Sequence, residues 1–291
     1  MQPATDVQAY EALARDPGER GRCYTSLVRD YYGFATELYR AVWGESHHFP
    51  PFRGGESRAE AMAAAERAIA DRGGFRPGMA VLDVGSGVGG PAVTIAGHSG
   101  AHVTGLELVR ERLEFARAHA AAQGMSHLTD FRSGDAMHLP FGDASFDAVY
   151  SIQAICHTPD AARVHAEVAR VLRPGGVYLG SDWFQAAGLT PGQQARLVEP
   201  VCQGLALPAL RTPQDLRRNL AAAGLVVEDV HDLGDEGDLE PNWREMEEVM
   251  AAVPQQDKTP VLDFMERAGT ALCLAARSGA FVMACWVARK P

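Results

Sequence analysis

Short apolar runs alternate with amphipathic segments through the middle of the chain. Runs of Val, Leu, Ile and Phe that end in Gly, Ser or Asp are typical of buried strands. Spacings of three and four between apolar residues, closed by Gly100, Gly124 or a Pro-Gly-Gly stop, are typical of helices. This pattern predicts strands at 79–85, 101–108, 127–135, 146–152 and 175–184, and helices at 91–100, 109–124 and 158–176.

The alternation of strands and helices favours an α/β fold with a doubly wound, mostly parallel sheet of the Rossmann type. Residues 225–230 and 280–290 add two expected strands, giving seven. The flanks differ, because residues 1–75 are helical in pattern and rich in aromatics. We therefore expect a helical cap at 1–75 and a core at 76–185. Residues 186–291 would hold an inserted lid and the last two strands.

Composition narrows the function classes. The chain has 291 residues, 46% of them hydrophobic, with a net charge of -10 and a pI near 5.5. An acidic chain is a poor match for phosphate backbones, which argues against a nucleic-acid partner. Five scattered cysteines without a CxxC pair indicate neither a disulfide framework nor a zinc site. The polar start and the lack of a long apolar run predict a cytoplasmic protein without a membrane span.

A glycine-rich turn, VLDVGSGVGG (81–90), follows the first expected strand. Gly85, Gly87 and Gly90 satisfy the dinucleotide spacing, and Glu107 ends the next strand, where a carboxylate can accept ribose hydroxyls. This pattern alone fits both NAD and S-adenosylmethionine (SAM). Asp83 lies two residues before the turn and would repel a pyrophosphate, whereas it would attract an ammonium or a sulfonium.

Further motifs follow in order: Gly134-Asp135-Ala136, LPF (139–141), FDAV (146–149) and VLRPGG (171–176). Over about residues 75–185 this set resembles the class I SAM-dependent methyltransferases. The resemblance implies SAM as the cofactor and S-adenosylhomocysteine as its product. It also implies a set of cofactor-binding residues: Asp83, Gly85, Ser86, Gly87 and Gly89 at the methionine end, Glu107 and Leu108 at the ribose, Asp135 and Ala136 at the adenine, and Ser151 and Ile152 beside the sulfonium.

The flanks are similar to sterol 24-C-methyltransferases and related bacterial enzymes. The similar segments are YYGFATELYRAVWGESHHF (31–49), FRGGES (52–57), SIQAICHTPD (151–160) and the terminal VARKP. Two positions depart from the family pattern, since Gln153 replaces a Glu and Gly33 replaces an Asp. The Glu is the expected base of alkene methylation, and an amide cannot accept a proton at neutral pH.

A base must therefore come from elsewhere, and His157 is the candidate. Asp182, after the fifth strand, is expected to lie beside His157 and to form an acid–base pair with it. We place Gln153 with them in the catalytic group, Thr158 at the start of the following helix, and Arg112 on a solvated helix face. Residues expected to face the substrate are Tyr31, Tyr32, Trp43, His48 and Trp183.

The sequence thus predicts a SAM-dependent methyltransferase acting on a small lipophilic metabolite, such as a terpenoid, a sterol-like or a polyketide-type compound. C-methylation is favoured slightly. O-methylation of a natural product and N-methylation of a glycine-derived amine stay open, as does a SAM-binding cyclase that transfers no methyl group. A NAD-dependent oxidoreductase is the remote alternative. No metal is expected, the partner is a small molecule, and a homodimer stays open.

Overall fold

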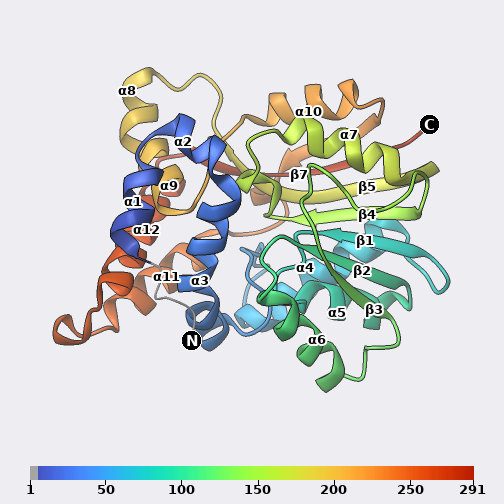
Figure 1. Cartoon of the computed structure of the whole chain (residues 1–291), viewed down its shortest axis with the longest axis horizontal. Helices are drawn as coiled ribbons and strands as arrows, with labels where there is room; N and C mark the ends of the chain where they lie inside the picture. The colour runs from blue at the N-terminus through green and yellow to red at the C-terminus, as the bar shows by residue number, and fades with distance from the viewer. Residues whose placement is uncertain (1–5) are drawn as a thin grey trace.

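A seven-stranded sheet forms the centre of the protein in a computed structural model that describes residues 6–291 (Figure 1). The strand order is β3-β2-β1-β4-β5-β7-β6. Neighbouring strands from β3 to β5 are parallel, whereas β7 runs antiparallel to both β5 and β6. The strands are β1 (Ala80–Val84), β2 (His102–Glu107), β3 (Thr129–Ser133), β4 (Phe146–Ile152), β5 (Leu172–Gln185), β6 (Val226–Asp232) and β7 (Phe281–Arg289).

Helices cover both faces of this sheet. Buried residues of α4, α5 and α6 pack on one face, and buried residues of α7 and α10 pack on the other. These five helices are α4 (Arg58–Gly73), α5 (Gly90–Ser99), α6 (Arg112–Ala122), α7 (Ala161–Val171) and α10 (Pro213–Ala222). The predicted doubly wound α/β fold with seven strands is confirmed.

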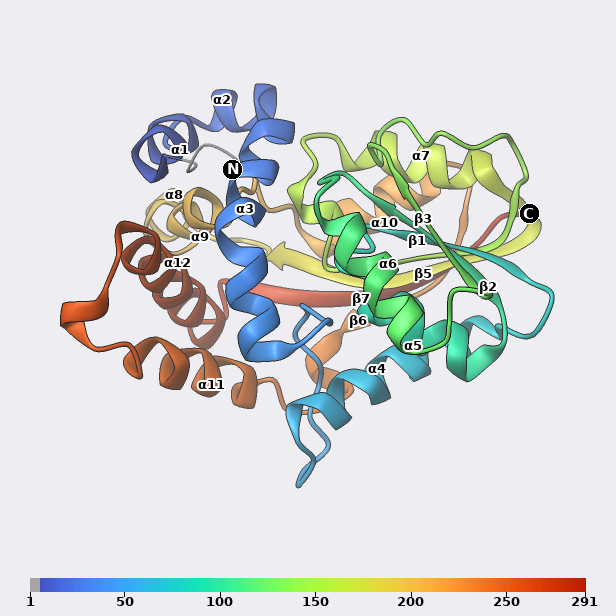
Figure 2. The same cartoon turned by 60° about the horizontal axis from the view of Figure 1, so that its bottom comes forward.

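The remaining helices gather at the end of the sheet where β1, β4 and β5 finish (Figures 1 and 2). The cap consists of α1 (Val7–Ala14), α2 (Pro17–Arg22) and α3 (Tyr24–Trp43). The apolar side chains of α1 and α3 share one core cluster with the lid helices α9 (Glu199–Gly204), α11 (Glu240–Ala251) and α12 (Pro260–Arg277). The short helix α8 (Pro191–Gln193) precedes α9 in the lid and has no buried residue. Cap and lid therefore form a second layer over the carboxyl ends of the strands, where ligands bind in open α/β sheets.

The lid is not one insertion, as the sequence pattern suggested. Its first part, α8 and α9, precedes α10, and its second part, α11 and α12, connects β6 to β7. Helix α10 between them packs on the sheet because Leu216 and Leu220 face the same cluster as α7.

Helix α7 begins two residues later than the sequence predicted. The N-cap is Asp160, whose carboxylate accepts from the Arg163 N–H at 3.0 Å. Thr158 does not cap the helix and instead belongs to the preceding turn, where its hydroxyl donates to the Ile155 carbonyl. No helix among residues 6–291 is long and apolar enough to cross a membrane.

Candidate active site

A pocket with an empty volume of about 890 Å³ lies beyond the carboxyl ends of β1, β2 and β4, on the side covered by the cap. We call it the donor pocket. Glycine forms the floor of the donor pocket because a larger side chain would not fit there. Gly85 has φ +87°, and a Cβ there would lie 2.3 Å from the Ala154 side chain. The N–H groups of Gly85 and Ser86 both donate to the Leu106 carbonyl of β2 at 2.9 Å, which fixes the turn that leads from β1 into α5.

Three buried polar atoms at the pocket lack a hydrogen-bond partner within the described residues: Asp83 Oδ2, Ser86 Oγ and Arg112 Nε. Buried polar groups are nearly always paired in native proteins, so unpaired groups at one pocket indicate a ligand that pairs with them. A carboxylate, a hydroxyl and a guanidinium together fit the ammonium and carboxylate of an amino acid, such as the methionine end of SAM. Burial raises the pKa of Asp83 to about 8.

The donor pocket is also lined by the carboxylates of Glu107 and Asp135. Glu107 accepts from the Gly87 N–H at 2.9 Å and from the Val109 N–H at 2.8 Å. Asp135 accepts from the Met137 N–H at 2.8 Å and from the Tyr24 hydroxyl. These bonds hold both carboxylates at the ends of β2 and β3, where an adenosine would need acceptors.

Most of the expected cofactor residues line this pocket, including Leu108, Ala136 and Ile152. Two do not. Ser151 is fully buried behind the wall, and its hydroxyl donates to the Val84 carbonyl at 2.9 Å. Gly89 starts α5 with φ +88°, and a Cβ there would lie 2.9 Å from the Ala116 side chain, so it serves helix packing.

Arg112 is the main residue that sequence reasoning missed. It was assigned to a solvated face, yet its side chain is only 7% exposed and reaches into the donor pocket. Its guanidinium carbon lies 4.0 Å from the centre of the Tyr32 ring, and Nη1 lies 3.6 Å from Glu107. The sequence gives little signal for this position. Arg112 is the first residue of α6, and helical periodicity does not fix which side chains of a first turn face the edge of the sheet.

Tyr32 and His157 meet where the donor pocket joins a small aromatic cavity. The Tyr32 hydroxyl lies 3.1 Å from His157 Nε2, and His157 Nδ1 lies 3.3 Å from the Ala206 carbonyl. A carbonyl can only accept, so Nδ1 carries the proton and Nε2 accepts from Tyr32. Burial lowers the pKa of His157 to about 4, so the imidazole is neutral at pH 7.

The predicted pair of His157 with Asp182 is wrong. Asp182 is buried and accepts from the backbone N–H groups of Cys156 and Trp183 at 2.9 and 2.8 Å. Burial raises its pKa to about 6. Asp182 thus holds the loop that carries His157, whereas the two ring nitrogens of His157 face Tyr32 and the Ala206 carbonyl instead.

Gln153 joins the cap segment to the core through its side-chain amide. Its oxygen accepts from the Phe49 N–H at 2.9 Å, and its nitrogen donates to the Phe49 carbonyl at 3.0 Å. The same oxygen accepts from Trp183 Nε1 at 2.9 Å. A carboxylate cannot donate, so only an amide completes this three-bond arrangement, and Gln153 acts as a positioning residue rather than a base.

The aromatic cavity leads on to an apolar pocket with an empty volume of about 770 Å³ between the cap and the lid. Trp43, Phe49 and Trp183 line both spaces, and three methionines of α11 and α12 line the far wall. Tyr31 lines only the aromatic cavity, where its hydroxyl bonds that of Tyr39. His48 borders the donor pocket and lies 3.0 Å from Glu66, which holds it in place.

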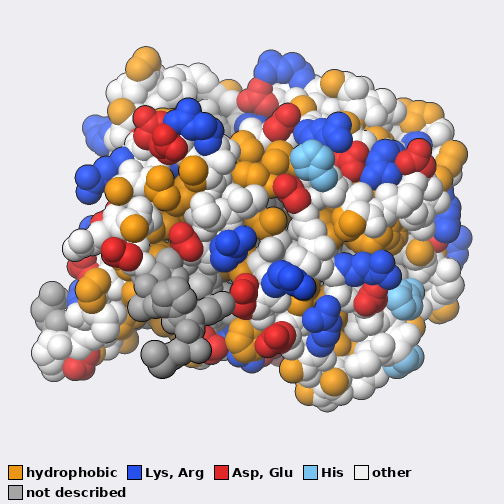
Figure 3. Space-filling view, in the orientation of Figure 1, with side chains coloured by type: hydrophobic (Ala, Val, Ile, Leu, Met, Phe, Trp, Pro, Cys, Tyr) orange, Lys and Arg blue, Asp and Glu red, His pale blue; other side chains and the backbone are white. Residues whose placement is uncertain are grey.

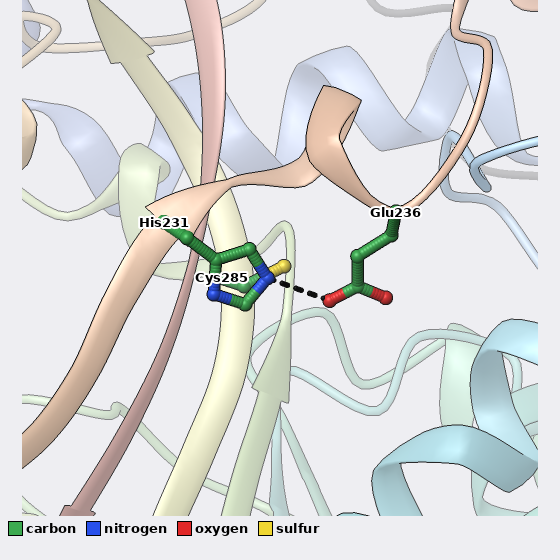
Figure 4. A group of neighbouring side chains, drawn as sticks. All are labelled: His231, Glu236 and Cys285. Carbon is green, nitrogen blue, oxygen red and sulfur yellow. Dashed lines mark hydrogen bonds and ion pairs between the residues drawn. The ribbon is translucent and has the colours of Figure 1, made fainter.

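One group of side chains elsewhere has the residue types of a metal site: His231, Glu236 and Cys285 (Figure 4). His231 contacts Asp229 through Nδ1 at 2.7 Å and Glu236 through Nε2 at 2.8 Å. Burial lowers the pKa of His231, but the two carboxylates raise it by more, so its pKa lies above the ordinary value. Arg72 pairs with Glu236 at 2.7 Å. Both carboxylates thus already have partners: Asp229 contacts His231, and Glu236 contacts His231 and Arg72.

The surface in the view of Figure 3 carries interspersed acidic and basic side chains rather than one continuous basic area.

Comparison with protein families finds a methyltransferase domain at residues 82–180. A sterol 24-C-methyltransferase from Gibberella zeae is 47% identical over 166 residues, which are 57% of this chain and 44% of that protein. A cycloartenol-C-24-methyltransferase from Oryza sativa is 38% identical over 206 residues, or 70% of this chain and 60% of that protein. The chain spans less than two thirds of the length of these relatives.

Solved structures confirm the fold. A [4+2]-cyclase, SpnF, matches 92% of this chain with a TM-score of 0.77 and 24% identity. A sarcosine dimethylglycine methyltransferase from Galdieria sulphuraria matches 88% with a TM-score of 0.77 and 21% identity. A geranyl diphosphate C-methyltransferase from Streptomyces coelicolor matches 92% with a TM-score of 0.70 and 19% identity.

The glycine turn, the unpaired polar atoms of the donor pocket and these matches agree: residues 82–180 match a methyltransferase domain, and the chain is similar in sequence to sterol C-methyltransferases.

Proposed function

We propose that the protein transfers a methyl group from SAM to a lipophilic small molecule, most favourably to a carbon atom of a terpenoid or sterol-like acceptor. One observation carries this proposal. The donor pocket, the aromatic cavity and the apolar pocket lie next to one another in that order, and neighbouring spaces share lining residues. An acceptor in the apolar pocket can therefore reach the donor pocket past Trp183, Tyr32 and His157.

Each part of the site has a role in this reaction. SAM supplies an electrophilic methyl group. The unpaired atoms of Asp83, Ser86 and Arg112 would hold its amino-acid end, while Glu107 and Asp135 would accept from its ribose and adenine. The cap excludes water and fixes the line of attack, which supplies much of the rate in a displacement of this kind.

Methylation of an alkene carbon leaves a positive charge on the acceptor, and aromatic faces stabilise such a charge. Tyr32, Phe49 and Trp183 surround the aromatic cavity in which it would form. The Tyr32 hydroxyl then takes a proton from the acceptor while it passes its own to His157 Nε2, which is neutral and accepts from Tyr32.

O-methylation is the second candidate, and the same pair favours it. Neutral His157, acting through Tyr32, can accept the proton of an acceptor hydroxyl as that hydroxyl becomes strongly acidic while its oxygen is being methylated. The absence of a free carboxylate at Gln153 supports this alternative, because the family base is replaced by an amide with three hydrogen bonds.

We also propose that the protein works in a reducing, cytoplasmic compartment and serves small-metabolite biosynthesis. All five cysteines are free thiols, and four of them are buried.

SAM with a labelled methyl group, mixed with the protein and a metabolite extract of its source organism, tests the function. We expect label in the organic-soluble fraction, and mass fragmentation then separates a C-methyl from an O-methyl product. Label only in the water-soluble fraction would favour an amine acceptor instead. SAM binding without transfer to either fraction would favour a non-transferring protein.

Tyr32→Phe tests the proton route. We expect a loss of about 100-fold in kcat, within the usual range for an acid–base group, with SAM affinity unchanged. Tyr39→Phe is the matched control, because Tyr39 lines the same cavity but bonds Tyr31 rather than His157. Equal activity of the two variants would remove Tyr32 and His157 as the base.

A further inference from the structure

The far end of the apolar pocket contains a charged pair in an otherwise apolar wall. Lys258 and Glu266 are the only charged side chains among its described lining residues. Their ammonium and carboxylate groups form an ion pair. Neither residue lines the donor pocket or the aromatic cavity, so the pair marks the end away from the reacting atoms.

This end of the pocket is partly open to solvent. The Glu266 side chain is 34% exposed and the Lys258 side chain 15%. Both belong to the α11–α12 part of the lid, which lies on the far side of α3 from β1 and β2 in Figures 1 and 2. A ligand that fills the pocket with its hydrocarbon body would therefore place its other end against this pair.

The charges of the pair restrict what that end can be. The pair has no net charge, so it favours neither sign: a carboxylate or diphosphate that approaches Lys258 also meets Glu266, and an ammonium that approaches Glu266 also meets Lys258. A pure hydrocarbon would cover the pair and remove it from water without compensation. A hydroxyl both accepts and donates, so it can accept from Lys258 and donate to Glu266 while the pair stays neutral.

We infer that Lys258 and Glu266 form a subsite that recognises a neutral hydroxyl group at the end of the lipophilic acceptor opposite to the methylated atom. This inference rests on the proposed function, because it takes the molecule in the apolar pocket to be the acceptor of the methyl group. The pocket walls suit such a ligand, because Met246, Met250 and Met265 are flexible and adapt to an apolar body.

Binding of a matched ligand series tests the subsite independently of catalysis. The probes are farnesol, farnesyl methyl ether and farnesoic acid, which share one hydrocarbon chain. Quenching of Trp43 and Trp183, which both line the pocket, reports occupancy. We expect wild-type protein to bind farnesol about tenfold more tightly than either other probe, the effect of losing one hydrogen bond to a charged group.

The double variant Lys258→Met, Glu266→Leu removes both charges together and so leaves no unpaired ion. We expect the double variant to bind farnesol and the methyl ether with affinities that agree within about twofold. Its affinity for the ether should equal that of the wild-type protein. The control Asp263→Leu, Arg267→Met removes an ion pair of the same helix that does not line the pocket, and it should keep the preference.

Two results would overturn the subsite: equal wild-type affinity for all three probes, or an unchanged preference in the double variant. Tighter binding of farnesoic acid would also contradict it, because it would assign the site to an anion. SAM affinity and methyl transfer, measured on the same samples, separate this outcome from failure of the proposed function. A preference for the alcohol without methyl transfer would leave the subsite standing and remove the reaction.

Discussion

At the scale of single residues, we expect Asp83 to couple cofactor binding to the release of a proton. Its carboxyl is buried at the end of β1, and one oxygen has no partner in the described structure. Burial raises its pKa to about 8, so the carboxyl carries a proton at pH 7 before ligand binding. The ammonium of SAM would favour the ionised form and lower that pKa.

Binding should therefore release a proton, and SAM affinity should rise with pH between 6 and 7.5. SAM affinity should rise by at most tenfold per pH unit, because a single carboxyl titrates. Calorimetry in buffers of different ionisation enthalpy measures both quantities. The Asp83→Asn variant should bind SAM more weakly, and its SAM affinity should no longer depend on pH in this range. A flat wild-type profile would show that Asp83 does not face the ammonium.

Gln153 illustrates a residue whose role depends on a distant segment. Gln153→Glu should lower the free energy of unfolding by about 1–3 kcal/mol, because the carboxylate faces the Phe49 carbonyl without a proton to donate. Chemical denaturation at pH 7.5 measures this loss. Gln194→Glu, at an exposed position, should stay within about 0.5 kcal/mol. Equal stability of both variants would show that the amide bonds contribute nothing.

At the scale of elements, the sheet and its helices could be predicted because each has a periodic apolar face or a glycine stop. The site could be predicted only in part. The turn at Gly85 and the acids at Asp83 and Glu107 are adjacent to strand ends, so sequence spacing places them. The contacts of Arg112, Tyr32 and Gln153 could not be predicted, because their partners come from other segments that meet only in the folded chain.

The α11–α12 connection shows the same limit. Its helices were predicted only as part of one lid, since amphipathic periodicity does not say that they enclose a cavity. Gly269 of α12 lines this cavity, and a Cβ there would lie 2.7 Å from Met250 Sδ.

Gly269→Leu should therefore fill the apolar pocket. We expect farnesol affinity to fall at least tenfold, because the leucine occupies space that the ligand needs, while SAM affinity stays within about twofold. Tryptophan fluorescence and calorimetry measure the two. Thr270→Leu, at the next and exposed position of α12, is the control. Unchanged farnesol binding by Gly269→Leu would show that the acceptor lies elsewhere.

At the scale of the whole molecule, cap and lid are joined by a buried arginine. The Arg20 side chain is 2% exposed and pairs with Glu199 through two hydrogen bonds of 2.8 and 2.9 Å. It also donates to the Ala14 carbonyl at 2.6 Å. Arg20 thereby links α2 of the cap to α9 of the lid.

Arg20→Ala should lower the free energy of unfolding by about 3–5 kcal/mol, because it leaves Glu199 without its partner and several acceptors unpaired. Urea denaturation measures the change. Arg22→Ala, which removes an exposed pair with Glu19, should cost less than about 1 kcal/mol. A small effect of Arg20→Ala would mean that apolar packing alone joins cap and lid.

The division of the lid into two separate connections has an evolutionary consequence. The apolar pocket is bounded by α3, which precedes the sheet, and by α11 and α12, which form a single loop between β6 and β7. The donor pocket depends on β1, β2 and β4 instead. Exchange of residues 240–277 between relatives would therefore retarget the acceptor while cofactor use is inherited intact, which gives this architecture a simple route to new products.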